Sequence, residues 1–180
     1  MKVNITKRDG RAEPVNLDKI HRVLTWAAAG LDHISISQVE LQSHIQLYEG
    51  VKTTDIQSIL IKTAADLISA DAPDYQYMAA RLAIFHLRKI AYGDFEPPPL
   101  YEHVKKMGAW GKYDSQLLTD YSEEEFNQMD SYIDHTRDMN LSYAAVNQLQ
   151  GKYLVQNRAT GQLYESPQML FRFQPQKGAN

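Results

Sequence analysis

The hydrophobic side chains between residues 17 and 92 recur every three or four positions, which is the period of an amphipathic α-helix. Breaks in this pattern divide the stretch into four predicted helices. They begin at Leu17, at Ser37, directly after Thr53-Thr54-Asp55 and near Asp71. They end at Ala29, near Gly50, near Ile68 and near Gly93. Four amphipathic helices of this length can enclose a common hydrophobic core.

Local signals support these limits. Asn16 is a residue type that caps helix N-termini, and Gly30 is one that ends helices. Ser37 and Glu40 have the spacing of a capping box, in which each side chain bonds the other residue's backbone amide. Pro73 is compatible with a first helical turn, where its missing N–H needs no partner.

The residues before Leu17 predict a small β-hairpin. Two short strand-like stretches, Ile5–Arg8 and the residues around Glu13–Val15, flank the turn-forming pair Asp9-Gly10. The predicted fold class is therefore mainly α: a four-helix bundle capped by a small N-terminal β-hairpin or sheet.

The second half of the chain follows a less regular pattern. Three consecutive prolines, Pro97–Pro99, exclude a helix and predict a stiff spacer. Beyond them we expect a helical extension with a β-hairpin, whose helices are Tyr101–Met107, Ser122–Met129 and Ser142–Leu149 and whose strands are Tyr153–Arg158 and Gln162–Tyr164. The predicted division is a domain over residues 1–93, a linker over 94–99, a helical region over 100–170 and a polar, frayed tail over 171–180.

Composition narrows the class of protein. The chain has 180 residues, 43% of them hydrophobic, which suits a folded domain. Its net charge of −3 offers no general basic field for nucleic acid, and no apolar run reaches the roughly 20 residues of a membrane helix. The absence of cysteine excludes disulfides and thiol chemistry in this chain. Because no secretory signal pattern is present, we expect a cytoplasmic protein that binds neither nucleic acid nor membrane.

Candidate chemistry gathers near the N-terminus, where the cations Lys7, Arg8 and Lys19 are close in sequence to Glu13 and Asn16. Cations suit phosphates, and the carbonyl oxygens of Glu13 and Asn16 suit the edge of a base. Neighbours in a strand point to opposite faces, so Lys7 and Arg8 face the helices together only if the strand bends. Lys19 lies in a first helical turn, which attracts anions. The spacing indicates a nucleotide site, with a solvated surface lysine as the open alternative.

The fourth predicted helix adds candidates near its C-terminus. His86 can contact a phosphate or bond a neighbour inside the protein. Arg88 and Lys89 lie where cations stabilise a helix, and that interpretation is preferred for Arg88. The apolar candidates for the walls of a base slot, which can equally be core residues, are Ile5, Val15, Ile20 and Phe85.

Other kinds of site find no support in the sequence. The chain has no glycine-rich phosphate loop, which argues against P-loop nucleotide hydrolysis. Its histidines lack metal-ligand spacing, and Glu123–Glu125 follow Ser122 as the acidic first turn of a helix. We therefore predict neither a metal site nor a catalytic residue in this chain.

Three stretches resemble one known family: Thr6–Gly10, Asn16–Leu24 and Asp71–Leu82. They are similar to the N-terminus of the large (alpha) subunit of class Ia ribonucleoside-diphosphate reductase, and the resemblance extends from Ile5 to about Leu170. Residues 1–93 would then be an ATP cone, the allosteric activity domain of that family. The resemblance implies binding of ATP, which activates, or of dATP, which inhibits, usually with Mg²⁺, in deoxyribonucleotide biosynthesis.

The resemblance also assigns site residues. It implies polar contacts to the nucleotide from Lys7, Arg8, Glu13, Asn16, Lys19, Thr53, His86 and Lys89, and apolar contacts from Ile5, Val15, Ile20 and Ile56. The family often has a histidine where this chain has Gln57, near the phosphates. A neutral amide cannot become cationic there, so this position bears on nucleotide affinity and on discrimination between ATP and dATP.

The resemblance has limits that shape the expected function. The family continues past Leu170 into a barrel with the catalytic cysteines, whereas this chain diverges over Phe171–Asn180. We therefore expect a regulatory module that is inactive as an enzyme by itself and holds no redox cofactor. One alternative is an interaction or decoy module that binds the reductase small subunit or a full-length large subunit. Another is a nucleotide-sensing transcriptional regulator, although such repressors carry a cysteine-rich zinc ribbon.

Overall fold

The contacts within the chain define two units. The computed structural model describes residues 3–7 and 9–173. The first unit comprises the residues up to His86 together with Met139–Val146, and the second comprises Leu87–Asp138 and the residues from Asn147 onward. Both units are mainly helical, as the hydrophobic pattern predicts. The domain limits at residues 93 and 99 stay predictions.

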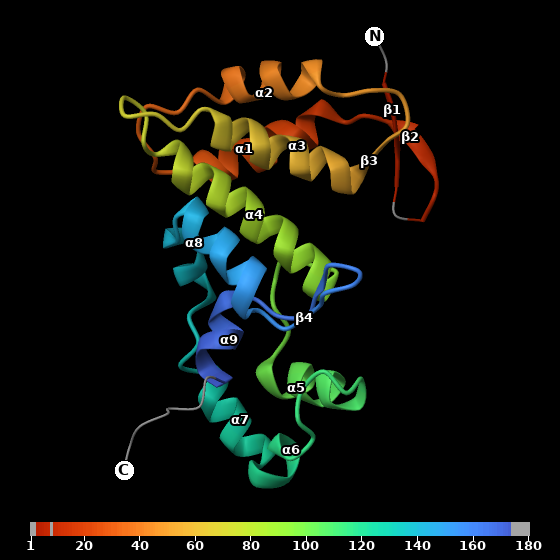
Figure 1. Cartoon of the computed structure of the whole chain (residues 1–180), viewed down its shortest axis with the longest axis vertical. Helices are drawn as coiled ribbons and strands as arrows, with labels where there is room; N and C mark the ends of the chain where they lie inside the picture. The colour runs from red at the N-terminus through yellow and green to blue at the C-terminus, as the bar shows by residue number, and fades with distance from the viewer. Residues whose placement is uncertain (1–2, 8, 174–180) are drawn as a thin grey trace. The chain divides into compact units, whose positions relative to one another are not determined.

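The first unit is a helical bundle. Its elements are α1 (Leu17–Ala28), α2 (Ile36–Ile45), α3 (Thr53–Asp66) and the part of α4 (Tyr75–Tyr92) that precedes Leu87. Figure 1 shows α1, α2 and α3 lying side by side. Their apolar stripes meet in one core, which contains Leu24, Ala27, Val39, Ile56, Leu60, Ala64, Met78 and Leu82. The predicted four-helix bundle is confirmed.

A distant segment of the chain completes this bundle. Tyr143, from Met139–Val146, packs against the core of the first unit. The Arg81 guanidinium on α4 donates to the backbone oxygen of Met139 at 3.2 Å and to that of Ala29, after the end of α1, at 2.7 Å. The first unit is therefore discontinuous in sequence.

A small sheet lies at one end of the bundle. Strand β1 (Asn4–Thr6) pairs antiparallel with β2 (Ala12–Pro14), which confirms the hairpin, and parallel with β3 (Val51–Lys52). Gly10 closes the turn with a φ of 83°, a conformation that favours glycine. The pattern did not predict β3, because two residues are too short to show the alternation of a strand.

The helix caps are partly as predicted. The Asn16 side chain accepts from the Lys19 amide at 3.0 Å, which confirms it as the N-cap of α1. The capping box at Ser37 is wrong: the N-cap of α2 is Ser35, whose backbone N–H donates to the Tyr75 hydroxyl at 3.0 Å. The Ser35 hydroxyl also accepts from the Gln38 amide at 3.2 Å, so the cap uses the spacing of Ser35 and Gln38. Helix α2 also ends at Ile45, earlier than predicted, because the chain turns towards β3.

The second unit contains more short elements than the pattern predicts. They are α5 (Leu100–Ala109), α6 (Leu117–Asp120), α7 (Glu123–Asp130), the 3₁₀ helix η1 (His135–Asn140), α8 (Tyr143–Gln148), the π-helix η2 (Leu149–Tyr153), β4 (Gln156–Asn157), β5 (Gln162–Leu163) and α9 (Pro167–Phe173), of which η1 and α8 extend into the first unit. The acidic first turn after Ser122 and the hairpin are confirmed, and Pro97–Pro99 lie outside the helices as expected. The frayed tail is wrong for Phe171–Phe173, which are helical, and its remainder lies outside the described residues.

The core of the second unit is formed by Leu100, Val104, Phe126 and Met169. Arg88 is only 3% exposed and lies 3.0 Å from Asp138, so it forms a buried ion pair instead of a solvated helix-end contact. Among the described helices, none has both the length and the apolar character needed to span a membrane.

Candidate functional site

A cavity of about 220 Å³ lies in the first unit, where the hairpin meets α1, α3 and α4. Its lining residues are Ile5, Lys7, Glu13, Val15, Asn16, Lys19, Ile20, Val23, Thr53, Ile56, Gln57, Leu60 and Phe85. Two ammonium groups therefore share one cavity with a predominantly aliphatic wall. This combination suits a ligand with an apolar ring and an anionic group.

The structure brings most of the predicted site residues together in this cavity. Val23 and Leu60 also line it and were not predicted. Each lies one helical turn after a predicted residue, Ile20 or Ile56, so helical spacing would have found them. The cavity draws on β1, β2, α1, α3 and α4, which are far apart in sequence.

Three predicted residues stand apart from this lining. His86 is not among the residues that line the cavity. Lys89 belongs to the second unit, where its Nζ lies 3.1 Å from an Asp94 carboxylate oxygen. Arg8 lies outside the described residues. Their part in a nucleotide site stays a prediction.

Lys7 and Glu13 form an ion pair across the hairpin, with 2.9 Å between Nζ and Oε1. The hydrogen bond from Lys7 holds the pKa of Glu13 below its ordinary value, and Lys19 lowers this pKa further. Glu13 is therefore an anion at neutral pH. Its carboxylate pairs with the Lys7 ammonium, and both side chains line the cavity.

The N-terminus of α1 contributes an anion-attracting end to the cavity. Asn16 uses its side-chain oxygen to cap the helix, and its amide group can still donate to a ligand. Lys19, one turn into α1, adds its charge to the positive end of the helix dipole. Asn16 therefore both caps α1 and lines the cavity.

The N-terminus of α3 faces the same cavity. Thr53 is the first residue of α3, and the preceding residue, Lys52, provides no side-chain cap within the described part of the chain. Gln57 follows one turn later, and its Oε1 is buried without a hydrogen-bond partner among the described residues. Residues from the N-termini of two helices thus line one cavity, and a helix N-terminus is a site where proteins bind phosphates.

An aromatic pair closes one side of the cavity. Phe85 lines it and stacks at a tilt on Trp26, with 5.9 Å between ring centroids. Together with Ile5 and Ile20, the Phe85 ring provides an apolar surface on which a planar base can lie.

The cavity is poorly equipped to hold a metal ion through protein ligands. Among its lining residues, Glu13 is the single carboxylate, and Lys7 occupies it. Across residues 3–7 and 9–173, no three His, Asp or Glu side chains gather as a metal site. A magnesium ion bound here would take most of its ligands from phosphate oxygens and water.

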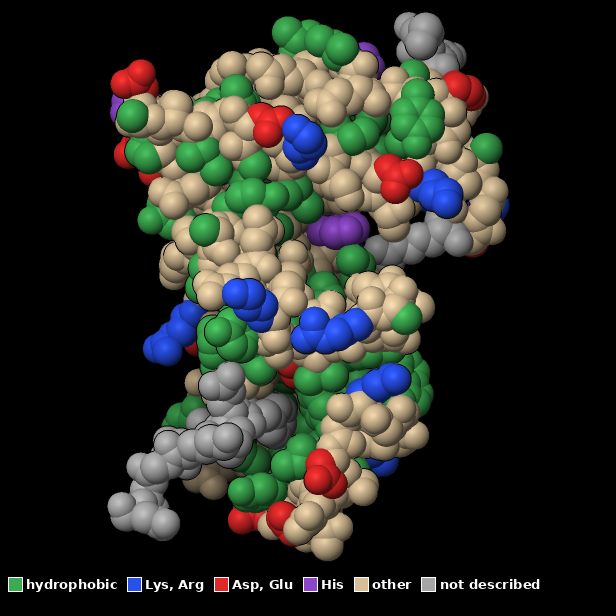
Figure 2. Space-filling view, viewed as in Figure 1, with side chains coloured by type: hydrophobic (Ala, Val, Ile, Leu, Met, Phe, Trp, Pro, Cys, Tyr) green, Lys and Arg blue, Asp and Glu red, His purple; other side chains and the backbone are tan. Residues whose placement is uncertain are grey.

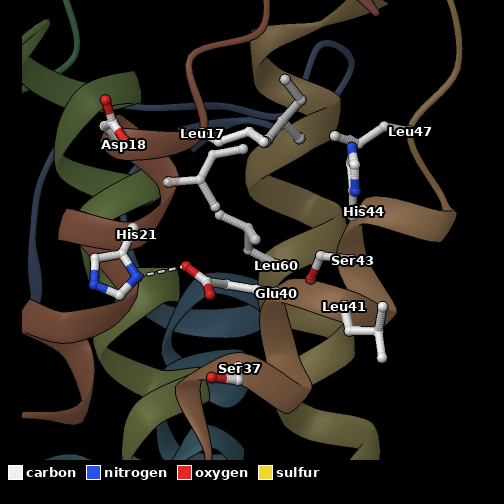
Figure 3. Close-up of a pocket in the computed structure, with 12 residues that line it drawn as sticks. Leu17, Asp18, His21, Ser37, Glu40, Leu41, Ser43, His44, Leu47 and Leu60 are labelled. Atoms are coloured by element: carbon white, nitrogen blue, oxygen red, sulfur yellow. Dashed lines mark hydrogen bonds and ion pairs between the residues drawn. The ribbon is translucent and has the colours of Figure 1, made fainter. Parts of the chain in front are cut away.

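A second, larger cavity of about 430 Å³ lies among α1, α2 and α3 (Figure 3). Its lining includes the carboxylates of Asp18 and Glu40 but neither lysine nor arginine. Carboxylates repel phosphates, so the smaller cavity with Lys7 and Lys19 is the candidate nucleotide site. The sequence analysis did not predict this second cavity.

Comparison with known proteins agrees with this geometry. Residues 3–90 match the ATP cone domain family and are therefore an ATP cone domain. Over 167 residues, 93% of its length, the chain is 71% identical to ribonucleoside-diphosphate reductase 1 subunit alpha of Escherichia coli. It is 68% identical to the subunit alpha of Haemophilus influenzae over the same length, and 44% identical over 171 residues to that of Enterobacteria phage T4. Each match covers 22% of the relative, so the chain spans about a fifth of these proteins.

Proposed function

We propose that this chain senses adenine nucleotides as an allosteric module of a ribonucleotide reductase. ATP or dATP would bind in the cavity between the hairpin and α1, α3 and α4. The main support is a single cavity that is lined by residues from the N-termini of α1 and α3 and by the ammonium groups of Lys7 and Lys19. The rest of its wall is aliphatic and aromatic, which suits a base. The ATP cone match over residues 3–90 supports the same ligand.

The proposed binding mode follows from the chemistry of the lining. The base would lie against Ile5, Ile20 and Phe85, with Glu13 accepting from its exocyclic amine. The phosphates would face Lys7, Lys19 and the amides that open α3. Mg²⁺ would accompany the phosphates and offset their charge. Each proposed contact to the base or the phosphates uses a residue that lines the cavity.

Thermal unfolding with nucleotide tests this function. A ligand that binds only the folded chain raises the melting temperature in proportion to the logarithm of its concentration. We expect ATP and dATP with Mg²⁺ to raise it, and Lys7→Ala to weaken their affinity about tenfold because a charge-assisted contact is lost. Calorimetric titration measures this affinity.

Lys62→Ala is the matched control. Lys62 is 70% exposed on α3 and pairs with Asp66 at the surface, so its loss changes net charge equally without touching the cavity. We expect its nucleotide affinity to equal that of the unmodified chain. A folded sample whose melting temperature does not change at millimolar ATP or dATP would disprove the proposed function.

Binding to a reductase small subunit or to a full-length large subunit is the alternative function, and it stays a proposal. The relatives are alpha subunits, a name that implies assembly with other subunits. Co-purification of this chain with a small subunit, with and without dATP, separates a partner-binding module from one that senses nucleotide alone.

A further inference from the structure

The larger cavity of the first unit has the features of a second ligand site. Residues of α1, of α2 and the segment after it, and of α3 line it. Its volume of about 430 Å³ is in the range of small-molecule sites, which are mostly apolar with a few polar groups. The lining of this cavity fits that description.

Ser43 is the observation that points to a ligand. Its side chain is only 3% exposed, and its Oγ has no hydrogen-bond partner in the described part of the chain. A buried hydroxyl nearly always has a partner, and a helical serine commonly bonds the carbonyl one turn back. Figure 3 shows Ser43 and Glu40 projecting from α2 into the cavity. The hydroxyl can therefore donate to, or accept from, a molecule held there.

The charged side chains that line the cavity indicate which class of ligand it can bind. Two carboxylates, those of Asp18 and Glu40, line it, and Glu40 Oε1 lies 2.6 Å from His21 Nδ1. No lysine or arginine is among the lining residues to attract an anion. An uncharged or cationic molecule is therefore favoured over an anionic one.

The surface near this cavity is also apolar. Leu41 lines its rim and is 64% exposed, and Ile45 follows it on α2. Figure 2 shows hydrophobic side chains on the surface over α2. Contact with this rim would add apolar burial for a ligand larger than the cavity.

Three side chains connect this cavity with the proposed nucleotide site. Ile20, Ile56 and Leu60 line both. A molecule that packs against one side of these residues restricts their positions on the other side. Such a restriction changes nucleotide affinity by some factor, and nucleotide must then change the affinity of the second ligand by the same factor.

We propose that the cavity among α1, α2 and α3 binds a small, apolar, uncharged or cationic molecule that hydrogen-bonds Ser43, and that this ligand is coupled to the nucleotide through the shared wall. The coupling rests on the proposed nucleotide site. Binding to the cavity does not, so the two parts fail separately.

Probe molecules of matched shape test the binding part on the full chain. The probes are 2-phenylethanol, 2-phenylethylamine, ethylbenzene, which lacks a polar group, and 3-phenylpropanoate, which is an anion. We expect the methyl NMR signals of Leu41, Leu47 and Leu60 to shift with the alcohol and the amine at millimolar concentration, and much less with the anion. Equal shifts with 3-phenylpropanoate would overturn the assigned ligand class.

Ser43→Ala isolates the hydroxyl. We expect the substitution to lower the affinity for 2-phenylethanol about fivefold to tenfold, because one hydrogen bond is lost. The affinity for ethylbenzene should not change. Ser58→Ala is the matched control, because Ser58 is exposed on α3 and bonds the Thr54 carbonyl outside the cavity. If Ser43→Ala and Ser58→Ala have the same affinity for 2-phenylethanol, Ser43 does not hydrogen-bond the ligand and the proposal is wrong.

Leu41→Ser separates a ligand site from a protein interface. Since Leu41 is exposed, the substitution leaves the core intact. We expect it to lower the affinity of the chain for every probe. If no probe binds while Leu41→Ser reduces association with a reductase subunit, the cavity belongs to a protein interface and the ligand proposal falls.

The coupling is measured by titrating ATP in the presence and absence of saturating 2-phenylethanol. We expect nucleotide affinity to change at least threefold, and the affinity for the alcohol to change by the same factor when ATP is saturating. Unchanged affinities with both ligands bound would refute the coupling alone. Absence of ATP binding would refute the nucleotide site and leave the cavity proposal to the probe titrations.

Discussion

Some residues of the proposed nucleotide cavity have two roles. Lys7 pairs with Glu13 in the structure, so a nucleotide phosphate bound at Lys7 would replace one anion by another. Gln57 presents a buried carbonyl oxygen that has no partner among the described residues. An acceptor beside phosphates is unfavourable, whereas the amide nitrogen of the same side chain is a donor. We therefore expect the Gln57 amide to turn its nitrogen towards a bound phosphate.

A histidine at position 57 would add a titratable charge to this cavity. Because the imidazolium forms below about pH 6.5, Gln57→His should tighten nucleotide binding severalfold at about pH 6 relative to the unmodified chain. At about pH 8 the Gln57→His variant and the unmodified chain should bind the nucleotide with nearly equal affinity. Calorimetric titrations at the two pH values measure the ratio of affinities, which cancels the titration of the phosphate itself.

Ser58→His provides the comparison for this prediction. Ser58 is the next residue on α3 and is exposed, so a histidine there adds the same charge outside the cavity lining. We expect it to change the affinity ratio little at either pH. If both histidine variants behave alike, position 57 does not face the phosphates.

At the scale of elements, caps decide where the helices begin. The sequence was sufficient to predict the Asn16 cap, because capping by Asn16 is a contact within one turn. The prediction chose Ser37 instead of Ser35, although Ser35 and Gln38 also have capping-box spacing and the Ser35 hydroxyl accepts from the Gln38 amide. The hydrogen bond from the Ser35 amide to Tyr75, forty residues away, is a further contact that spacing does not show. Strand β3 was not predicted because its two residues show no alternation, and its pairing with β1 joins residues far apart in sequence.

The two caps yield a matched pair of variants. Asn16→Ala and Ser35→Ala should each lower the free energy of unfolding by about 1 kcal/mol, because each leaves first-turn amides without a side-chain acceptor. Only Asn16→Ala should also weaken nucleotide binding, since Asn16 lines the cavity and Ser35 does not. Chemical denaturation and calorimetric titration measure the two effects. Equal losses of affinity would mean that stability, and not contact, controls binding.

At the scale of the whole molecule, local patterns predict the longer helices, whereas the short helices of the second unit and the contacts between distant segments were not predicted. The hairpin and α1 part of the site followed from spacing, whereas Thr53 and Ile56 of α3 were reached through the family resemblance. The addition of Met139–Val146 to the first unit was not predictable, because Arg81 and Tyr143 have no sequence signal that joins them to the bundle. Helical periodicity shows which face is apolar but not which segment covers it.

The second unit holds buried ionisable groups that make its stability depend on pH. His103 of α5 is almost completely buried, and its ring lies edge-on to those of Tyr92 and Tyr113. Burial, with a smaller effect from Lys106, lowers the pKa of His103 to about 4. Nearby, Glu165 accepts from Tyr113 and from the Val155 amide, and burial raises the pKa of Glu165.

These shifts act in opposite directions as the solution is acidified. Below about pH 6.5 an unfolded chain protonates His103 while the folded chain does not, so His103 removes about 3 kcal/mol of stability between pH 6.5 and 4. Glu165 takes up its proton more readily when folded, which offsets part of this loss. We therefore expect His103→Gln to flatten the decrease in unfolding free energy below pH 6.5 and to leave the pH dependence above it unchanged. Denaturation curves across this range measure both slopes, and an equal decrease in the variant would show that the folded chain protonates His103 as easily as the unfolded chain does.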